Sequence, residues 1–399
     1  MNILFVTPRL LYPPNRGDRL RPFHFARVLS KRHNLYLLSF IQSKDEISNI
    51  EHLNRYFDSI ETVYLPVSRS IVNVAINLFS FLPLQVCYFK DRTFKKKIDY
   101  IINDKKIQLI YIFHLRLAQY FANMKNVYRV LDLCDAVTLF LSRFIKHAPW
   151  YKKPIYTYEL RCVRKYEKTL MQKFNEYWII SDEDKRALET DLVLDNLYKL
   201  PNGIDVDYFQ SDLATIRKRK YKKNIFFVGY MNVESVDSVL YFYHQMFPFI
   251  KAEVPGTKFY VVGADPPKVI RDLSHDPNVI VTGYVEDLKE WYMNANVVIA
   301  PNRFVAGMQN KVLEAMAMCL PVVCTSFCNE GINATNGKEI FVANNPTDFA
   351  QMVVQLLKNR DLATEIGERA RIFVQNNFRW ERVEERIIAI EKKLQAKSA

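Results

Sequence analysis

Long apolar runs are missing from this 399-residue chain, and none reaches the roughly 20 uninterrupted residues that a membrane-spanning helix requires. Glycine and proline are also scarce, at 10 and 17 residues, while hydrophobic residues make up 49% of the chain. This composition excludes collagen-like, low-complexity and intrinsically disordered proteins. Residues 2–7 have a strand-like pattern in place of the basic segment and cleavage site of an export signal. We therefore expect a globular, cytoplasmic protein.

Paired cysteines are absent as well, because the six cysteines are scattered without any C-x-x-C spacing. Most of them stand in apolar runs, where a buried and reduced thiol is the expected state. A reducing compartment such as the cytoplasm fits this pattern.

The two halves of the chain differ in what they lack. The first 200 residues contain a single glycine, Gly17, whereas the other nine lie after residue 200. The first half carries 32 Lys and Arg against 20 Asp and Glu, and the second half carries 24 against 23, so the net charge of +13 lies almost wholly in the first half. A basic half predicts an anionic partner, which can be nucleic acid, an acidic membrane face or a phosphorylated substrate. Since single cores stop growing at about 250 to 300 residues, we expect two dissimilar domains.

Strand-like runs alternate with helix-length segments along both halves. Alternation of this kind predicts an α/β protein in which helices cover parallel sheets. The predicted strands are residues 3–6, 35–40, 62–65, 109–113 and 127–133, followed by 225–228, 259–262, 279–282, 297–300, 321–324 and 339–342.

Three predicted strands of the second half end in glycine, at Gly229, Gly263 and Gly283. A glycine at the carboxyl end of a parallel strand lets the backbone turn sharply or approach a ligand. Ligands of open α/β sheets bind outside those carboxyl ends. Each glycine taken alone is equally well explained as relief for a turn, but three at corresponding positions favour a binding edge.

The turn signal Pro-Asn-Gly at residues 201–203 lies between the halves. We predict a first domain over residues 1–195, a second over 196–375 and a C-terminal helix over 376–399 that packs back across the junction. That helix has one apolar face, formed by Val383, Ile387, Ile388, Ile390 and Leu394.

The longest apolar stretch, residues 71–88, is interrupted by polar residues and Pro83 and is followed by a basic run at 90–97. An amphipathic segment beside basic residues can lie in a membrane interface, held by apolar burial and by anionic lipid. The alternative is a core helix with a solvated basic neighbour, and the pattern leaves both open.

The most informative stretch is residues 301–323, where a polar loop with one glycine, Gly307, leads from a strand into a strong helix-forming run. Free N–H groups and the positive dipole end at such a helix start suit a phosphate or diphosphate. Arg303 and Lys311 supply compensating charge, and Glu314 lies one turn after Lys311 on the same face. A carboxylate there can accept hydrogen bonds from two ribose hydroxyls. The alternative is a surface Lys/Glu pair worth a few tenths of a kcal/mol.

Several motifs in order resemble glycosyltransferase family 4. They are Pro201-Asn202-Gly203-Ile204-Asp205 with Phe209, Gly283-Tyr284-Val285 with Asp287, and Gly307 to Glu314 running into Ala315-Met316-Ala317 and Pro321-Val322-Val323. More narrowly, Pro13-Pro14 through Gly17-Asp18 to Arg21, and Gln309 to Ala317, look like a bacterial exopolysaccharide-associated sugar transferase subgroup. The resemblance covers nearly the whole chain and is strongest in the second half.

The resemblance implies a GT-B fold, in which two Rossmann-like parallel-sheet domains face each other across a cleft and a C-terminal helix returns to the first domain. It also implies transfer with retention at the anomeric carbon, from a nucleotide-diphosphate sugar on the second domain to a saccharide acceptor, lipid-linked at the membrane face, on the first. Beyond the donor substrate no cofactor and no metal are expected. By resemblance Glu314 holds the ribose, and the base meets the backbone near Tyr284 and Val285. The diphosphate or donor sugar is surrounded by Gly307, Gln309, Asn310 and Lys311, near Arg303 and the strand-end Gly229.

In the first domain, His114 matches in position the histidine that family members place near the reacting sugar, which makes it a catalytic candidate with Lys311 and Glu314. Gly17 and Asp135 are candidates for the acceptor side, and Asp132 is a further polar residue of that edge. Each has a structural alternative: a simple turn for Gly17, a local hydrogen bond for His114 and a helix cap for the aspartates.

Two positions depart from the family pattern. Ala306 stands where many members carry a glutamate that contacts the donor sugar, and residues 230–234 lack the Arg and Lys that many members carry after the corresponding strand. Arg303 and Lys311 are our candidates for the missing charge. A sugar-nucleotide epimerase or phosphorylase of similar fold and an inactive sugar-binding protein remain alternatives, whereas a nucleic-acid-binding protein is disfavoured because no reader motif is present.

Overall fold

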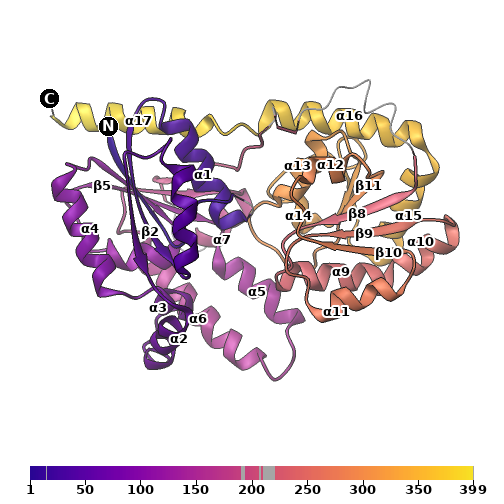
Figure 1. Cartoon of the computed structure of the whole chain (residues 1–399), viewed down its shortest axis with the longest axis horizontal. Coiled ribbons are helices and arrows are strands. Elements are labelled where there is room, and N and C mark those ends of the chain that lie inside the picture. The colour runs from indigo at the N-terminus through magenta and orange to yellow at the C-terminus, as the bar shows by residue number, and fades with distance from the viewer. Residues whose placement is uncertain (15, 190–193, 206–207, 210–220, 399) are drawn as a thin grey trace. The chain divides into compact units, whose positions relative to one another are not determined.

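The computed structural model describes residues 1–14, 16–189, 194–205, 208–209 and 221–398. The chain forms two compact α/β units (Figure 1). The first unit contains Met1–Leu200 and Trp380–Ala399, and the second contains Pro201–Arg379. The units therefore part at the Pro-Asn-Gly turn itself, five residues after the expected end of the first domain at residue 195.

The first unit is built on a seven-stranded sheet in which every pairing is parallel, in the order β3-β2-β1-β4-β5-β6-β7. All five strands expected in this half are present. The last two strands, β6 and β7, were not predicted. The strands are β1 (Asn2–Thr7), β2 (Asn34–Ile41), β3 (Ser59–Tyr64), β4 (Leu109–Phe113), β5 (Tyr128–Cys134), β6 (Glu176–Ile179) and β7 (Leu197–Lys199).

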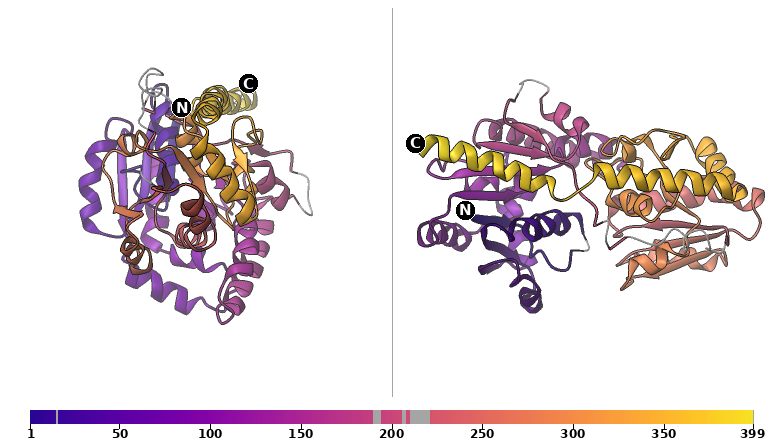
Figure 2. Two further views of the ribbon diagram at one scale, coloured as in Figure 1. Left: turned by 90° about the vertical axis from the view of Figure 1, so that its right-hand side faces the viewer. Right: turned by 90° about the horizontal axis from the view of Figure 1, so that it is seen from above.

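Helices cover both faces of this sheet, and each face has its own apolar core. The C-terminal helix α17 packs against α1 in the first unit (Figure 2). Its side chains Val383, Ile387 and Ile390 are buried in the same core as those of α1. The apolar face expected from the sequence is thus buried against the first unit. The helices are α1 (Gly17–Leu29), η1 (Lys44–Leu53), α2 (Val67–Ile76), α3 (Leu84–Tyr88), α4 (Arg92–Asp104), η2 (Leu115–Tyr120), α5 (Val137–His147), α6 (Lys153–Leu170), α7 (Asp182–Leu188) and α17 (Arg382–Ser398).

Helix α2 corrects one alternative drawn from the sequence. Its side chains Ile71, Val72 and Ile76 are exposed, and only Ser70 of the helix is buried. Phe79 and Phe81, in the turn that follows, are exposed too. The interpretation of this stretch as a core helix is therefore wrong for α2, whereas Val86 and Cys87 of α3, at the end of the same stretch, are buried. Among the helices that the structure describes, none has the length and apolar character needed to cross a membrane.

The second unit has a six-stranded sheet, again parallel throughout, in the order β10-β9-β8-β11-β12-β13. Every strand expected in this half is present. The strands are β8 (Asn224–Val228), β9 (Lys258–Val262), β10 (Val279–Gly283), β11 (Val297–Ala300), β12 (Val322–Cys324) and β13 (Phe341–Val342). The helices are α9 (Val233–Gln245), α10 (Phe247–Glu253), α11 (Lys268–Arg271), η3 (Asp272–His275), α12 (Leu288–Tyr292), α13 (Asn310–Ala317), α14 (Ser326–Asn329), α15 (Pro346–Lys358) and α16 (Arg360–Asn377).

Both sheets have the strand order of a doubly wound fold. In the first, the chain runs outward from β1 to β3 and then crosses to β4 on the other side of β1. In the second, it runs from β8 to β10 and then crosses to β11 on the other side of β8. Such switch points leave a crevice at the carboxyl ends of the two diverging strands, where ligands of these folds bind. Each unit is therefore expected to hold a ligand at this place.

Candidate functional site

The strand-end glycines of the second unit lie side by side at the carboxyl edge of its sheet. The Gly229 amide donates to the Val262 carbonyl at 3.0 Å, and the Gly263 amide donates to the Gly283 carbonyl at 3.1 Å. A Cβ atom on Gly263 would lie 1.8 Å from the Gly229 carbonyl oxygen, and Gly283 has a φ of +72°. Close backbone packing and a left-handed turn thus account for Gly263 and Gly283 without any ligand.

Gly229 differs from its two neighbours, because it borders a charged side chain. A Cβ atom built on it would lie 3.3 Å from Ser235 Oγ and 3.9 Å from Lys311 Cδ. The predicted binding residues Gly229 and Lys311 are therefore brought together, at the switch point between β8 and β11.

Helix α13 begins beside this glycine, after the loop that follows β11. Gly307 in the loop has a φ of +69°, a backbone conformation that residues other than glycine rarely adopt. Gln309 is the N-cap residue, and its side chain makes no capping hydrogen bond. Asn310 Oδ1 accepts a hydrogen bond of 2.9 Å from Asn202 Nδ2, so the Pro-Asn-Gly turn also reaches the helix start. Backbone N–H groups at such an uncapped start suit an anion.

Lys311 is the cation of this helix start, and it is only 9% exposed. Its ammonium nitrogen lies 4.2 Å from the centre of the Phe227 ring of β8. Burial lowers the pKa of Lys311, an effect that is opposed by Cys328, Glu234 and Glu314. No hydrogen bond or ion pair to this ammonium is found within the residues that the structure describes. A buried cation of this kind is suited to a ligand that brings negative charge.

Glu314 lies one turn further along α13 and is half-buried. The Tyr292 hydroxyl donates to Glu314 Oε2 at 3.2 Å and lies 3.3 Å from the Lys311 carbonyl oxygen. Burial raises the pKa of Glu314 to about 7, although the Tyr292 hydrogen bond and the Lys311 charge both act to lower it. The alternative of an exposed Lys/Glu surface pair is therefore wrong, because both side chains lie in a largely buried site.

A second carboxyl group belongs to this site and was not predicted. Glu234 lies in the first turn of α9, and burial raises its pKa to about 7 while the charge of Lys311 lowers it. Glu234 stands in the segment that departs from the family pattern, where we looked for a missing cation rather than for a partner of Lys311. Tyr292 was missed as well, since nothing local in the sequence indicates its contact with Glu314.

Arg303 has a partner inside the second unit. Its guanidinium forms a two-pronged ion pair with Asp237 of α9, with a distance of 2.9 Å from Nε to Asp237 Oδ2, and it lies 4.8 Å from the centre of the Tyr241 ring. The positive charge of Arg303 is thus matched by a carboxylate, which leaves Lys311 as the better candidate to face a phosphate. A contact between Arg303 and a donor remains a prediction.

Tyr284 and Val285, the candidates for contact with a base, directly follow β10. The Tyr284 side chain is 66% exposed, and Val285 is half-buried. Two residues further on, Asp287 caps α12 and accepts a hydrogen bond of 2.7 Å from the Tyr208 hydroxyl. Their role in base binding also remains a prediction.

In the first unit, His114 directly follows β4, at the switch point. Its backbone amide donates to the Asp132 carbonyl at 2.7 Å, and its φ of +71° turns the chain into η2. The ring is 8% exposed, and Nδ1 has no hydrogen-bond partner. Burial and the nearby Arg116 hold the pKa of His114 well below its usual range, so the imidazole is neutral. A neutral imidazole can take part in hydrogen bonding, and a catalytic role remains a prediction.

The other candidates of the first unit divide into edge and core residues. Gly17 begins α1, and a Cβ atom there would meet nothing within 4 Å, so the backbone does not require glycine. Asp135 follows β5 and interacts with the charge of Arg116. Asp132 is fully buried, where it accepts hydrogen bonds of 2.7 Å from Arg21 Nε and from the Tyr111 hydroxyl. The interpretation of Asp132 as a residue of the binding edge is therefore wrong.

Metal and disulfide chemistry can be described briefly. Within the described ranges, no group of three or more His, Cys, Asp or Glu side chains is arranged to hold a metal ion. All six cysteines are free thiols.

Comparison with known proteins finds similarity to glycosyltransferases. Residues 222–359 match the family described as group 1 glycosyl transferases. An uncharacterized 44.6 kDa protein in the cps region of Klebsiella pneumoniae is 24% identical over 397 residues, covering 94% of this chain and 96% of that protein. The capsular polysaccharide biosynthesis glycosyltransferase CapM of Staphylococcus aureus is 27% identical over 198 residues, covering 46% of this chain and 52% of CapM.

The fold is shared with solved structures. The crystal structure of Anabaena HepE in complex with UDP-glucose superposes with a TM-score of 0.68 at 13% identity, covering 98% of this chain and 100% of HepE. Two Rossmann-like units with parallel sheets are the expected GT-B architecture. These matches support the resemblance found in the motifs: residues 222–359, within the second unit, are similar to group 1 glycosyl transferases, and the chain as a whole has the fold of the solved glycosyltransferase structures.

Proposed function

We propose that this protein is a retaining glycosyltransferase of bacterial surface polysaccharide synthesis, which moves a sugar from a nucleotide-diphosphate donor to a lipid-linked saccharide. The observation that carries the proposal is the buried Lys311 ammonium beside Glu314 at the uncapped start of α13. A diphosphate brings negative charge that can pair with the Lys311 ammonium, and a ribose supplies two hydroxyl donors for the Glu314 carboxylate. The similarity to CapM supports the polysaccharide context.

In the proposed reaction, the bond between the anomeric carbon and the donor phosphate breaks while a bond to the acceptor hydroxyl forms on the same face of the sugar. The departing phosphate oxygen takes the proton of the acceptor hydroxyl, so no strong protein base is required. Lys311 and the N–H groups of α13 stabilise the negative charge that develops on the leaving diphosphate. Glu314 holds the ribose and thereby positions the anomeric carbon. In this mechanism protein cations do the work for which other enzymes use a metal.

UDP-glucose is the first donor to test, because HepE, a protein of the same fold, was crystallised with it. Binding of UDP-glucose to the purified chain is measured by calorimetry, and transfer is then assayed with lipid-linked saccharides extracted from bacterial membranes. If UDP-glucose does not bind, other nucleotide sugars are screened by their effect on thermal stability.

Lys311→Met should lower transfer about 100-fold, as expected for the loss of one group that stabilises a developing oxyanion. Lys311→Met should change thermal stability little, because the buried ammonium that it removes has no hydrogen bond or ion pair within the described residues, while its interactions with Glu234 and Glu314 are opposed by the cost of its burial. Transfer at the wild-type rate by Lys311→Met would refute the proposed site. Isomerisation of the sugar nucleotide without an acceptor would instead identify an epimerase.

Contact with a membrane belongs to the proposal, and the exposed apolar side chains of the first unit support it. Phe79, in the turn after α2, is 84% exposed, and Trp150, just before α6, is 83% exposed. Both segments lie toward the lower edge of the first unit in Figure 1. They are linked, since the Tyr158 hydroxyl of α6 donates to the Leu78 carbonyl at 2.9 Å and Lys165 lies 6.0 Å from the centre of the Phe81 ring. Apolar side chains next to lysines match an anionic lipid surface.

The membrane contact is tested with vesicles of phosphatidylcholine and phosphatidylglycerol. We expect the wild-type chain to sediment with vesicles that contain phosphatidylglycerol, and Phe79→Glu to remain in the supernatant. Ile372→Glu is the matched control, because Ile372 is also an exposed apolar side chain, 59% exposed, but lies on α16 of the second unit. Equal sedimentation of Phe79→Glu and the wild type would exclude this surface.

A further inference from the structure

The switch point of the first unit carries a cluster of arginines that was not predicted. Arg9 follows β1, Arg116 lies in η2 just after β4, and Arg16 is the N-cap residue of α1. Because β1 and β4 are neighbours in the sheet and the chain diverges from them, these residues stand at the place where an open α/β sheet binds its ligand. We call Arg9, Arg16 and Arg116 the arginine cluster.

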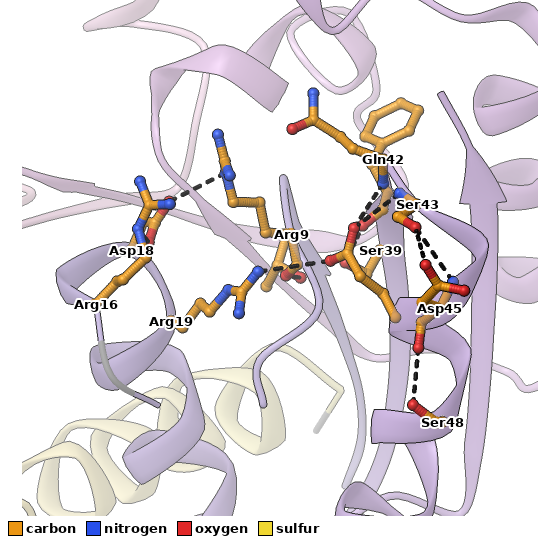
Figure 3. Close-up of polar contacts among 12 residues, drawn as sticks. Arg9, Arg16, Asp18, Arg19, Ser39, Gln42, Ser43, Asp45 and Ser48 are labelled. Atoms are coloured by element: carbon orange, nitrogen blue, oxygen red, sulfur yellow. Dashed lines mark hydrogen bonds and ion pairs between the residues drawn. The ribbon is translucent and has the colours of Figure 1, made fainter. Parts of the chain in front are cut away.

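Asp18, in the first turn of α1, holds two members of the cluster. Arg9 Nε lies 3.2 Å from Asp18 Oδ2, and Arg16 Nε lies 3.6 Å from Asp18 Oδ1 (Figure 3). One carboxylate is thus shared by two guanidinium groups. Arg19, on the same helix, points away from this pair to Glu46, at 3.5 Å from Oε2, so it does not belong to the cluster.

Arg116 joins the cluster from the β4 side. Its Nε donates to Gln85 Oε1 at 3.2 Å, which holds the side chain in place without neutralising it. Burial lowers the pKa of Arg116, the charges of Arg9 and Arg16 lower it further, and Asp18 and Asp135 oppose the shift. The charges of Arg9 and Arg16 thus stand close enough to Arg116 to act on it, and Asp18 and Asp135 are the carboxylates that oppose them.

Two further groups at this edge are suited to an anion. The Arg16 side chain makes no capping hydrogen bond, so the first N–H groups of the 13-residue helix α1 are uncapped by it. His114 Nδ1 is buried next to Arg116 and has no hydrogen-bond partner among the residues that the structure describes. A group with several acceptor oxygens could take hydrogen bonds from guanidinium, amide and imidazole donors together.

We propose that the arginine cluster binds a diphosphate group, namely the one that joins the saccharide acceptor to its lipid. This inference rests on the proposed function, because it assigns the acceptor side of that reaction. Arginine suits the task, since its planar fork can pair with two phosphate oxygens and stays charged when partly buried. The site also explains the excess charge of the first half: part of it gathers at the edge where an anionic acceptor binds.

The test uses the full-length protein with inorganic diphosphate and geranyl diphosphate as probes, in the presence of saturating UDP to occupy the donor site of the second unit. Calorimetry should detect binding of both probes by the wild-type chain. Arg9→Gln and Arg116→Gln should each weaken binding about ten-fold or more, whereas Arg19→Gln, the matched control, should bind as the wild type does. Thermal unfolding of each variant shows whether it is folded.

The outcomes separate this inference from the proposed function. Binding of neither probe by the wild type, or binding that survives in both Arg9→Gln and Arg116→Gln, would overturn the diphosphate site even if UDP still binds. Equal affinity for the two probes shows that the cluster recognises the diphosphate itself, and tighter binding of geranyl diphosphate adds a contact to the lipid chain. If the wild-type protein does not bind UDP, that result would instead count against the proposed function.

Discussion

The two units have the same sheet topology, but different side chains stand at their switch points. At its switch point the second unit has Gly229 beside a single buried cation, Lys311, with two carboxyl groups of raised pKa nearby. The corresponding edge of the first unit has the arginine cluster around Asp18. A doubly wound sheet therefore fixes where a ligand binds, whereas the residues at its edge decide what kind of ligand it is.

The difference has a physical basis. In the second unit the backbone segments at Gly229 and Gly263 pack so closely that a side chain on Gly263 would clash, and the carboxyl groups of Glu234 and Glu314, whose pKa values are raised to about 7, can change charge near neutral pH. Guanidinium groups stay charged at any physiological pH. The second unit thus suits a ligand that contacts the backbone and carboxyl groups that titrate near neutral pH. The first unit suits an anion that keeps its charge throughout the physiological pH range.

The largest effect is expected from glycine replacement. Gly263→Ala should destabilise the second unit by about 3 kcal/mol, because the new Cβ atom would lie 1.8 Å from the Gly229 carbonyl oxygen and the backbone would have to move. Gly17→Ala in the first unit should change stability by no more than about 0.5 kcal/mol, since nothing lies within 4 Å of its Cβ position. Urea unfolding measures both. Equal free energies of unfolding for the two variants would contradict the claim that only the second unit requires glycine at its strand end.

A smaller effect is expected from pH. The pKa of Glu314 is raised to about 7, so its carboxylate forms as the pH rises through 7 and only then accepts hydrogen bonds from both ribose hydroxyls. Affinity for uridine should therefore increase several-fold between pH 6 and pH 8, and Glu314→Gln should remove the increase.

Uridine is the right probe for this measurement because it has no phosphate. Glu234 ionises in the same range, and its charge would repel a diphosphate near Lys311. UDP should consequently gain less affinity with pH than uridine does. A uridine affinity that is independent of pH in the wild type would contradict the assignment of Glu314 to the ribose.

The smallest effect is expected from Arg303→Gln. Because Asp237 already matches the charge of Arg303, we expect UDP affinity to fall by only about three-fold, far less than for Lys311→Met. Calorimetry with UDP compares the two variants directly. A loss as large as that of Lys311→Met would show that Arg303 leaves Asp237 to bind the donor.

Much of the fold was predictable because strand-like runs alternate with helix-length segments, a pattern that is visible among neighbouring residues. Every strand expected from the sequence is present, whereas β6 and β7 were not expected. Lys311 and Glu314 were found because their spacing places both on one turn of a helix that follows a glycine loop. Such information is contained in neighbouring residues.

Contacts between distant segments were not predictable in the same way. Asp132 lies near the end of β5 and Asp135 directly follows that strand, but Asp132 is buried against Arg21 and Tyr111, while Asp135 stays at the edge with Arg116. Likewise Arg303 and Lys311 were equal candidates until Asp237 proved to be the partner of Arg303. Only the packing of helices on the sheet distinguishes members of such pairs.

The sequence by itself determined the alternation of strands and helices, the division near residue 200 and the resemblance to a glycosyltransferase family, because periodicity, turn signals and ordered motifs are local properties of a chain. The tertiary structure decided which charges meet: Glu234 with Lys311 in the second unit, and Arg9 and Arg16 with Asp18 in the first. The strengths of these interactions depend on burial and on distances of a few ångströms. Those quantities exist only once the sheet brings its strand ends together.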